Sequence, residues 1–214
     1  MSVVLDNLDL YLEGMRTTVV LTLVSFALAM VIGTLVASAR VSPVPPLRAA
    51  GAFYVETIRN TPLLVLIVLF FFGVTKVGIR YSPFVSAVIV LGAYTGTFVA
   101  ETVRSGINAV AQGQAEAARS LGLTFQQVLG VVVLPQAFRT VVAPLGSVFI
   151  ALIKNSALAE VIAVSELTFR ADGIANSTAR PAAAFLGAAV AYVVLALPSG
   201  WLIGAIERKV AIRR

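Results

Sequence analysis

The chain has 214 residues, of which 59% are hydrophobic and only 12% are charged, and its mean hydropathy is +0.96. A soluble domain carries about a quarter charged residues, whereas the apolar residues here come in runs close to the ~20 needed to cross a bilayer as a helix, which excludes a soluble globular class. Cysteine and histidine are absent, which excludes disulfides, Cys–His nucleophiles and the usual zinc sites. The net charge is +6. The basic residues lie mostly at the ends of the apolar segments, which indicates membrane topology rather than nucleic-acid binding.

The first segment, residues 3–16, is expected to form an amphipathic helix on the membrane surface. Its apolar face carries Leu5, Leu8, Leu12 and Met15, and its polar face carries Asp6, Asp9, Glu13 and Arg16. This spacing is typical of a helix that lies in the interface, and a frayed terminus is the alternative. The acidic start is atypical of a cleavable signal peptide, so the first span is expected to act as an uncleaved insertion signal.

Five apolar stretches are expected to cross the membrane as helices. They are residues 17–39, 62–77, 83–103, 141–164 and 183–206. A proline-rich turn at residues 43–46 follows the first span. A short helix over residues 49–61 then leads into the second span, and its Glu56 and Arg59 are one turn apart and able to pair. The predicted fold class is therefore an all-α polytopic membrane protein.

Two ionisable residues, Lys154 and Glu160, lie inside the fourth predicted span, where a charge is costly unless it faces a cavity or a partner. Together with the neighbouring Asn155 and Ser156 they are candidates for the wall of a substrate path. A cation and an anion on one wall would suit a zwitterionic amino acid. The alternative is a structural role near the span end, with Lys154 reaching toward the interface. The helix is expected to be irregular in this half.

Two further patterns concern helix packing. Glu101 and Arg104 lie one turn apart at the end of the third span, and pairing between them is favoured over a gating role. Small-residue motifs that allow close helix approach occur in the third span, at Gly92 and Gly96, and in the fifth, at Gly200 and Gly204.

The basic residues orient the chain with its N-terminus outside and its C-terminus in the cytoplasm. In that orientation ten bases lie inside and five lie outside. The inner ones are Arg40, Arg48, Arg59, Arg104, Arg119, Arg139, Arg208, Lys209, Arg213 and Arg214, and the outer ones are Arg16, Lys76, Arg80, Arg170 and Arg180. The same orientation places the long central loop in the cytoplasm, where ATP is found.

The central loop contains a polar stretch, residues 113–135, that is predicted to form a helix–turn–helix. Residues 114–121 are rich in good helix formers, and Gly122 is expected to end the helix. Thr124 and Gln127 fit a capping box that starts a second helix, and Pro135 ends or kinks it. The small side chains Ala115, Ala117 and Ala118 would admit another protein, beside the polar Glu116 and Arg119. An ordinary connecting loop is the alternative.

This stretch resembles the EAA loop of type I ATP-binding-cassette (ABC) importer permeases. The resemblance rests on Glu116, Ala117 and Ala118, then Gly122, then Leu134 and Pro135. Flanking segments at 56–64, 101–113, 135–139 and 152–158 are similar to the polar amino-acid branch of that family. The resemblance implies one transmembrane permease domain over residues 1–214, with a coupling helix in a loop at about 105–140. Docking on an ATPase is implied for Glu116, Ala117, Ala118, Arg119, Gly122, Leu134 and Pro135.

What the resemblance implies for function is ATP-driven import of polar L-amino acids such as glutamate, glutamine, histidine or arginine across a bacterial plasma membrane. The implied partners are two ATPase subunits, a second permease chain (identical or paralogous), an extracytoplasmic binding protein and the lipid bilayer. None of the three lysines lies in a phosphate-binding Gly-x-x-x-x-Gly-Lys-Ser/Thr loop. No cofactor, metal site or catalytic residue is therefore expected in this chain, and ATP and magnesium are expected on the ATPase. Lys154 favours an acidic substrate slightly, and Glu160 partly cancels that preference.

Two other functions stay open at this point. An ATP-independent channel or secondary transporter would need no ATPase, but five spans cannot divide into equal inverted repeats. A membrane scaffold would use the central loop to bind another cytoplasmic protein. Co-purification of an ATPase and uptake assays distinguish these hypotheses.

Overall fold

The computed structural model describes residues 2–210, and every regular element within them is helical, as the all-α prediction expected. The elements are α1 (Ser2–Asp6), α2 (Leu8–Arg40), α3 (Pro45–Arg59), α4 (Leu63–Lys76), α5 (Pro83–Ala109), α6 (Gln112–Ser120), α7 (Phe125–Gln127), the π-helix η1 (Val128–Val133), α8 (Leu134–Thr140), α9 (Val142–Asn155), the 3₁₀-helix η2 (Ser156–Ile162), α10 (Leu167–Thr178) and α11 (Pro181–Val210). Arg213 and Arg214 of the predicted basic tail lie outside the described residues.

Within residues 2–210, four helical stretches are long and apolar enough to cross a membrane, and a fifth span results if α3 and α4 count as one. These two helices are bent by 101° at residues 60–62. The α2 and α5 helices run parallel, so the chain between them must cross the membrane in the opposite direction. This supports counting α3 and α4 together as the fifth span. Pro62 caps α4 at the bend, since it can begin a helix but not continue α3.

The most extensive helix contact joins α2 and α5. A Cβ added to Gly33 would lie 2.5 Å from the Val99 side chain, and one added to Gly92 would lie 2.7 Å from Leu28. Higher-numbered residues of one helix face higher-numbered residues of the other, so the helices run parallel. The motif with Gly96 in α5 thus makes the predicted close approach, with Ile32 against that glycine.

The matching motif in α11 makes no such approach within this chain. A Cβ on Gly200 would meet only Ile150, at 3.7 Å, and one on Gly204 only Arg208 of its own helix, at 3.6 Å. Spacing alone predicted both motifs, but only the α5 motif meets neighbouring side chains, those of Leu28 and Ile32, closely enough to need glycine.

The N-terminal segment is not a separate surface helix, so that prediction is wrong. After a break at Asn7 the chain enters α2, which runs without interruption from Leu8 into the first span. The buried face carries Tyr11 and Gly14, and the Tyr11 hydroxyl donates to the Ala184 carbonyl at 2.7 Å. The leucine face is exposed, with Leu12 at 56%. The helix continues because α10 and α11 cover its small-residue face.

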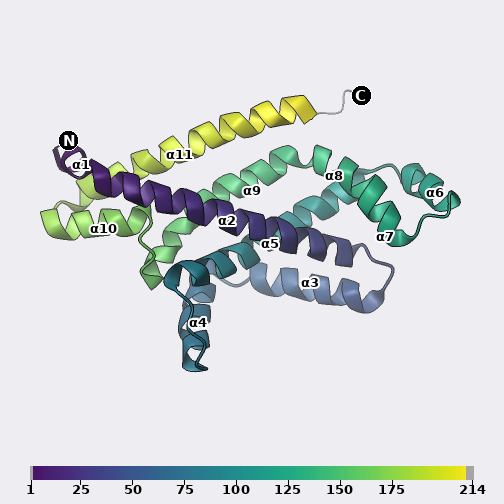
Figure 1. The fold of residues 1–214 in the computed structure, drawn as a ribbon, viewed down its shortest axis with the longest axis horizontal. Helices are drawn as coiled ribbons and strands as arrows, with labels where there is room; N and C mark the ends of the chain where they lie inside the picture. The colour runs from purple at the N-terminus through teal and green to yellow at the C-terminus, as the bar shows by residue number, and fades with distance from the viewer. Residues whose placement is uncertain (1, 211–214) are drawn as a thin grey trace.

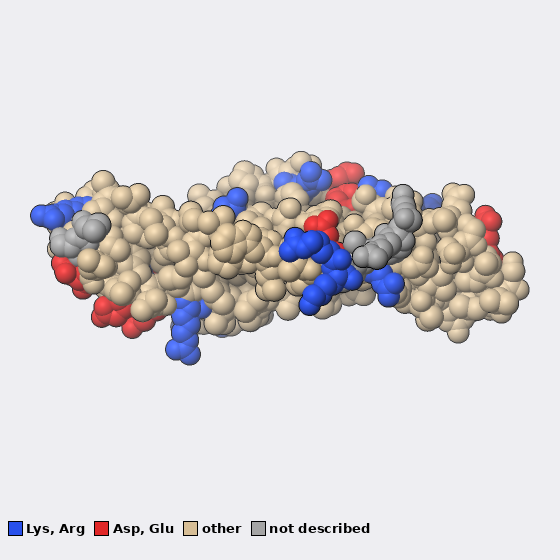
Figure 2. Space-filling model, turned by 90° about the horizontal axis from the view of Figure 1, so that it is seen from above, with Lys and Arg blue, Asp and Glu red and all other residues tan. Residues whose placement is uncertain are grey.

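A second difference is α10, which the sequence analysis left unassigned between the fourth and fifth spans. It packs against α11 and α2 at the end of the molecule that holds α1 (Figure 1). Figure 1 shows an elongated bundle with α6 and α7 at the opposite end, and α4 projecting sideways from its middle. Most of the surface in Figure 2 is uncharged, and the charged side chains form small separate groups on it.

Candidate functional site

The hairpin of residues 112–140 begins with α6, whose end has a defined hydrogen-bond pattern. Gly122 has a φ of +83°, the left-handed conformation that glycine adopts without strain. The Leu123 N–H donates to the Ala118 carbonyl at 3.3 Å, and the Gly122 N–H donates to the Arg119 carbonyl at 2.8 Å. These two bonds make a Schellman motif, so the predicted stop at Gly122 is confirmed.

The second arm starts at the predicted capping box. The Gln127 N–H donates to Thr124 Oγ1 at 3.4 Å, and the Thr124 N–H donates to Gln127 Oε1 at 2.9 Å. The arm then winds as a π-helix over Val128–Val133 before returning to α-helix at Leu134. Pro135 follows the π-helix and has no N–H to donate. It therefore accounts for the irregular turns before it, and it does not end the helix.

The two arms enclose a small core of their own. Ala118, Val128, Leu129 and Val133 are buried together. Ala118 therefore cannot offer an approach surface to another protein, as the sequence analysis expected it to, and Leu134 also packs inward. Of the predicted docking residues, Glu116, Ala117, Arg119, Gly122 and Pro135 are exposed. Leu121 at the tip is also exposed, at 81%. Sequence reasoning missed Leu121, although an apolar residue at a polar turn is a recognisable pattern.

A cavity of about 540 Å³ lies between α6, the end of α5 and η1. Its polar lining comes from Asn108, Gln112 and Arg119. The hairpin thus has a packed core, and it shares a hollow with the ends of α2 and α5, beyond which it projects (Figure 1).

The membrane-depth candidates are not brought together as one wall. Lys154 is exposed near the end of α9, Asn155 is half-buried, and Ser156 is buried with its hydroxyl donating to the Ile153 carbonyl at 2.7 Å. Glu160 is half-buried on η2. Among the described residues no ion pair links Lys154 to Glu160. The predicted irregularity is confirmed, since η2 replaces the α-helix from Ser156 onward.

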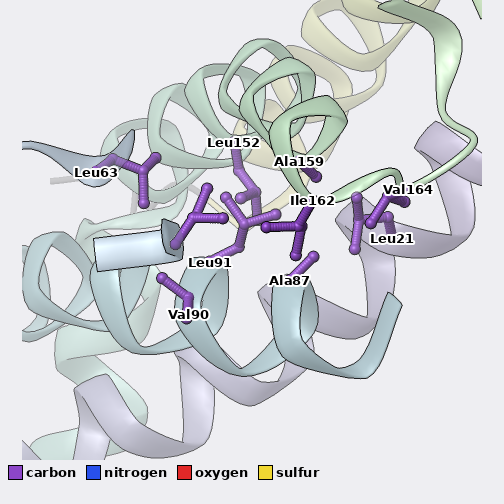
Figure 3. Packing of buried hydrophobic residues seen from close by; sticks show 10 residues of the cluster. Leu21, Leu63, Ala87, Val90, Leu91, Leu152, Ala159, Ile162 and Val164 are labelled. Carbon is purple, nitrogen blue, oxygen red and sulfur yellow. The ribbon is translucent and has the colours of Figure 1, made fainter. Parts of the chain in front are cut away.

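Two interrupted spans meet in one core cluster. Leu63, the first residue of α4 after its bend, and Leu152, just before η2, are buried in the same group. Figure 3 shows side chains from α2, α4, α5, α9 and η2 converging there. Irregular backbone at membrane depth is tolerated where protein or water covers it, and here Leu63 and Leu152, which lie next to the two breaks, are packed into one core.

The one fully buried acid in the described chain is Glu166, which sequence reasoning missed. It caps α10 by accepting from the Thr168 and Phe169 N–H groups, each at 2.9 Å, and it accepts from the Tyr192 hydroxyl at 2.7 Å. Burial raises the pKa of Glu166, and these three hydrogen bonds oppose the rise in part. Glutamate is not among the preferred N-cap residues, so no local signal in the sequence pointed to this role.

The predicted pair of Glu101 and Arg104 is present at 2.8 Å, and Arg40 of α2 joins it from the other side. Glu56 and Arg59 do not pair in the structure. Arg59 instead lies over the Phe98 ring, 5.2 Å from its centroid, and sits in the last turn of α3 before the bend rather than in a cytoplasmic loop. A guanidinium on an aromatic face needs less desolvation than a tight ion pair.

No group of three potential metal ligands occurs in residues 2–210.

Comparison with known proteins gives one consistent result. Residues 29–212 match the family described as "Binding-protein-dependent transport system inner membrane component". The chain is similar to the "Probable glutamine ABC transporter permease protein GlnM" of Bacillus subtilis, with 36% identity over 97% of this chain and 96% of that one. It is 40% identical to the "Glutamate transport system permease protein GluC" of Corynebacterium efficiens, with 95% of each covered.

Solved structures agree. The fold matches the "Crystal structure of an amino acid ABC transporter with histidines" with a TM-score of 0.86 and 34% identity, covering 96% of each chain. It also matches an inward-facing MetNI methionine ABC transporter with a TM-score of 0.79 at 23% identity, covering 96% of this chain and 98% of that one. The second likeness concerns the fold alone.

Proposed function

Because the chain belongs to the family of binding-protein-dependent transport system inner membrane components, and is the permease component of an amino-acid ABC importer, we propose that the hairpin of residues 112–140 is its coupling device. Glu116, Ala117 and Arg119 face outward on α6, where an ATPase subunit can reach them. ATP and magnesium are bound by that partner, and this chain catalyses no covalent step.

The observation that carries the proposal is the internal hydrogen bonding and packing of the hairpin. The Schellman motif at Gly122, the capping box at Thr124 and the buried group around Ala118 hold the two arms as one body. A rigid body transmits force, whereas a frayed loop would absorb it. ATP binding closes the ATPase dimer and draws two such hairpins together, which opens the bundle outward, and hydrolysis returns it inward.

Orientation and partners follow from the same role. The hairpin must be cytoplasmic, which places the N-terminus outside and the C-terminus inside, as the distribution of bases favours. Transport then needs a second permease chain, two ATPase subunits and an external protein that delivers substrate. The membrane is the bacterial plasma membrane.

The proposed cargo is a polar L-amino acid, with glutamate or glutamine as the first candidates. The support is the similarity to permeases whose names carry these two substrates. Lys154, Asn155, Ser156 and Glu160 are kept as candidates for the path, although the structure does not gather them. Uptake by the assembled complex, screened with glutamate, glutamine, histidine and arginine, identifies the cargo.

Coupling is tested with Gly122→Arg in the assembled complex. The substitution forces a bulky residue into left-handed backbone at the exposed tip, so ATP hydrolysis should continue while uptake falls. Asn176→Arg, an exposed change on α10 at the far end of the molecule, serves as the control and should keep both activities. Full uptake by Gly122→Arg would count against docking at this hairpin.

A further inference from the structure

The last turn of α3 lies near the middle of the membrane. The Tyr54 hydroxyl donates to the Ala93 carbonyl at 2.6 Å, and Ala93 is close to the midpoint of α5. From Tyr54 the helix runs on to Arg59 before the bend. A helix of 27 residues such as α5 is about 40 Å long, so its midpoint is far from both interfaces.

This turn is polar and uncovered. We use the name "polar turn" for residues 56–60, of which Glu56, Thr57, Arg59 and Asn60 are exposed. Phe98 covers one face of the Arg59 guanidinium. In the described chain Glu56 has no salt-bridge partner. A charge facing hydrocarbon at this depth is strongly unfavourable, and such residues face a cavity or a charged partner.

The backbone explains why the span ends here. The Asn60 side-chain amide donates to the Glu56 carbonyl, and the Thr61 hydroxyl donates to the Thr57 carbonyl, both at 2.8 Å. The Thr61 bond satisfies a carbonyl that the helix end would leave free, whereas the Asn60 amide adds to the bond that the Glu56 carbonyl already accepts from the Asn60 N–H. Pro62 then stops α3, and the chain turns by 101° into α4.

The helix after the bend has one face against the bundle and one face exposed. Leu63 and Ile67 of α4 are buried, and Leu66, Phe70 and Phe71 pack partly against the same cluster, whereas Leu69 at 64% and Phe72 at 51% are exposed. Figure 1 shows α4 pointing away from the body of the molecule. The polar turn and this apolar arm are therefore adjacent parts of one exposed surface.

We propose that the polar turn faces the polar turn of a second copy of this chain across a two-fold axis, with Glu56 of each copy paired to Arg59 of the other. The inference rests on the proposed function only in assuming that the permease works as a pair. Charge complementarity supports an identical partner, because a two-fold axis brings each residue of one turn to the opposite turn at the same depth. One helical turn separates the two residues by about 5 Å in depth, which an arginine side chain spans.

The pairing gives the charged turn a function. Two carboxylates and two guanidiniums meet where lipid would otherwise lie, and they balance each other in charge. Separation of the copies breaks both pairs together, so the four groups form a polar closure at mid-depth that opens only when the two bundles move apart. Glu56 and Arg59 are positioning residues for that closure.

Charge exchange between chains tests the pairing. Glu56→Arg and Arg59→Glu each place like charges opposite one another, so either variant alone should lose uptake by at least about tenfold. Co-expression of the two variants restores both pairs between chains, because each Arg at one position meets a Glu at the other. Uptake should then recover toward the wild-type rate.

An ion pair within one chain predicts the reverse result. Each variant chain would keep its own defect in the mixed complex, so co-expression without recovery, with both chains present and assembled, overturns the proposal. Recovery by the double variant alone does not distinguish the two cases, which is why the mixed complex is decisive.

Cross-linking gives a second test that needs no transport. The natural sequence has no cysteine, so Thr57→Cys carries a single thiol in the polar turn. Oxidation of the assembled complex in membranes should yield a disulfide-linked dimer of this chain. Val194→Cys, exposed on α11 on the other side of the bundle from α4, should stay monomeric under the same oxidant.

The outcomes separate the two proposals. A Thr57→Cys dimer in a complex that fails to couple ATP to uptake keeps the interface and rejects the coupling role. A cross-link to a different permease chain, or none at all beside an active complex, rejects the second copy as the partner.

Discussion

The Tyr192 hydroxyl donates a 2.7 Å hydrogen bond to the carboxylate of Glu166, and this bond fastens the start of α10 to the middle of α11. The Leu167 N–H donates to Thr18 Oγ1 at 3.2 Å, which attaches the same corner to α2. Glu166 thus joins α10 to α11, and the Thr18 bond holds the same corner against α2, at the end of the molecule opposite the hairpin.

Replacement of the Glu166 carboxyl group by an amide should destabilise the protein. Glu166→Gln retains an acceptor oxygen but turns an amide N–H₂ toward groups that are themselves donors, at a cost of about 1.5 to 3 kcal/mol. Tyr192→Phe loses one bond and should cost less, about 1 to 2 kcal/mol. Thermal unfolding of the purified protein in detergent measures both, and exposed Glu207→Gln is the control. Equal melting of all three variants would contradict the network.

The same carboxylate should make stability depend on pH. Burial raises the pKa of Glu166, so between the ordinary glutamate pKa and the raised one the folded state holds a proton that the unfolded state releases. Stability contributed by this proton is present at the low end of that window and is lost as pH rises through the folded pKa. Melting of wild type minus Glu166→Gln, measured from about pH 4.5 upward, should show that decline, and a flat difference would contradict it.

Gly33 should be the most sensitive glycine of the α2–α5 contact. A Cβ there lies 2.5 Å from Val99 and 2.8 Å from the Gly96 carbonyl, so Gly33→Ala must push the two backbones apart, at a cost of about 1 to 3 kcal/mol. Gly73 has nothing within 4 Å, and Gly73→Ala should be neutral or slightly stabilising. Denaturation of both variants measures the two changes in stability. Equal stabilities would mean that α2 and α5 separate easily at this contact.

Gly122→Ala should weaken the hairpin without crowding it. The position has open space but a φ of +83°, and a left-handed residue with a Cβ costs about 1 to 2 kcal/mol. Gly113 also has open space, with no left-handed φ, so Gly113→Ala is the matched control. Hydrogen exchange of the α6 amides should accelerate for the first variant alone.

Arg40 and Glu101 should be energetically coupled across helices. The Arg40 side chain is 16% exposed, so a double-mutant cycle with alanine at both positions should give a coupling of about 1 to 3 kcal/mol. The cycle for Glu101 and Arg104, which are neighbours on one helix surface, should give only about 0.3 to 0.5 kcal/mol. Comparable values in the two cycles would mean that Arg40 contributes little to helix packing.

Local sequence patterns determined the membrane class, the polar hairpin, its turn at Gly122 and its capping box at Thr124. Each depends on hydropathy over a helix length or on backbone geometry within a few residues, and the chain carries that information without its neighbours. The irregular half of the fourth span was predictable for the same reason. The family resemblance rested on the same local motifs.

Only tertiary packing decided which faces are covered. The leucine stripe at Leu8 and Leu12 predicted a surface helix, but the opposite face of α2 met α10 and α11 and extended the span. The Ala118 side chain lies in the hairpin core, and the Arg59 guanidinium lies over the Phe98 ring instead of pairing with Glu56. Glu166 joins α10 to α11 only because Tyr192, far along the chain, reaches it. Amphipathic spacing states that a helix has two faces, and the position of the other helices decides which face is buried.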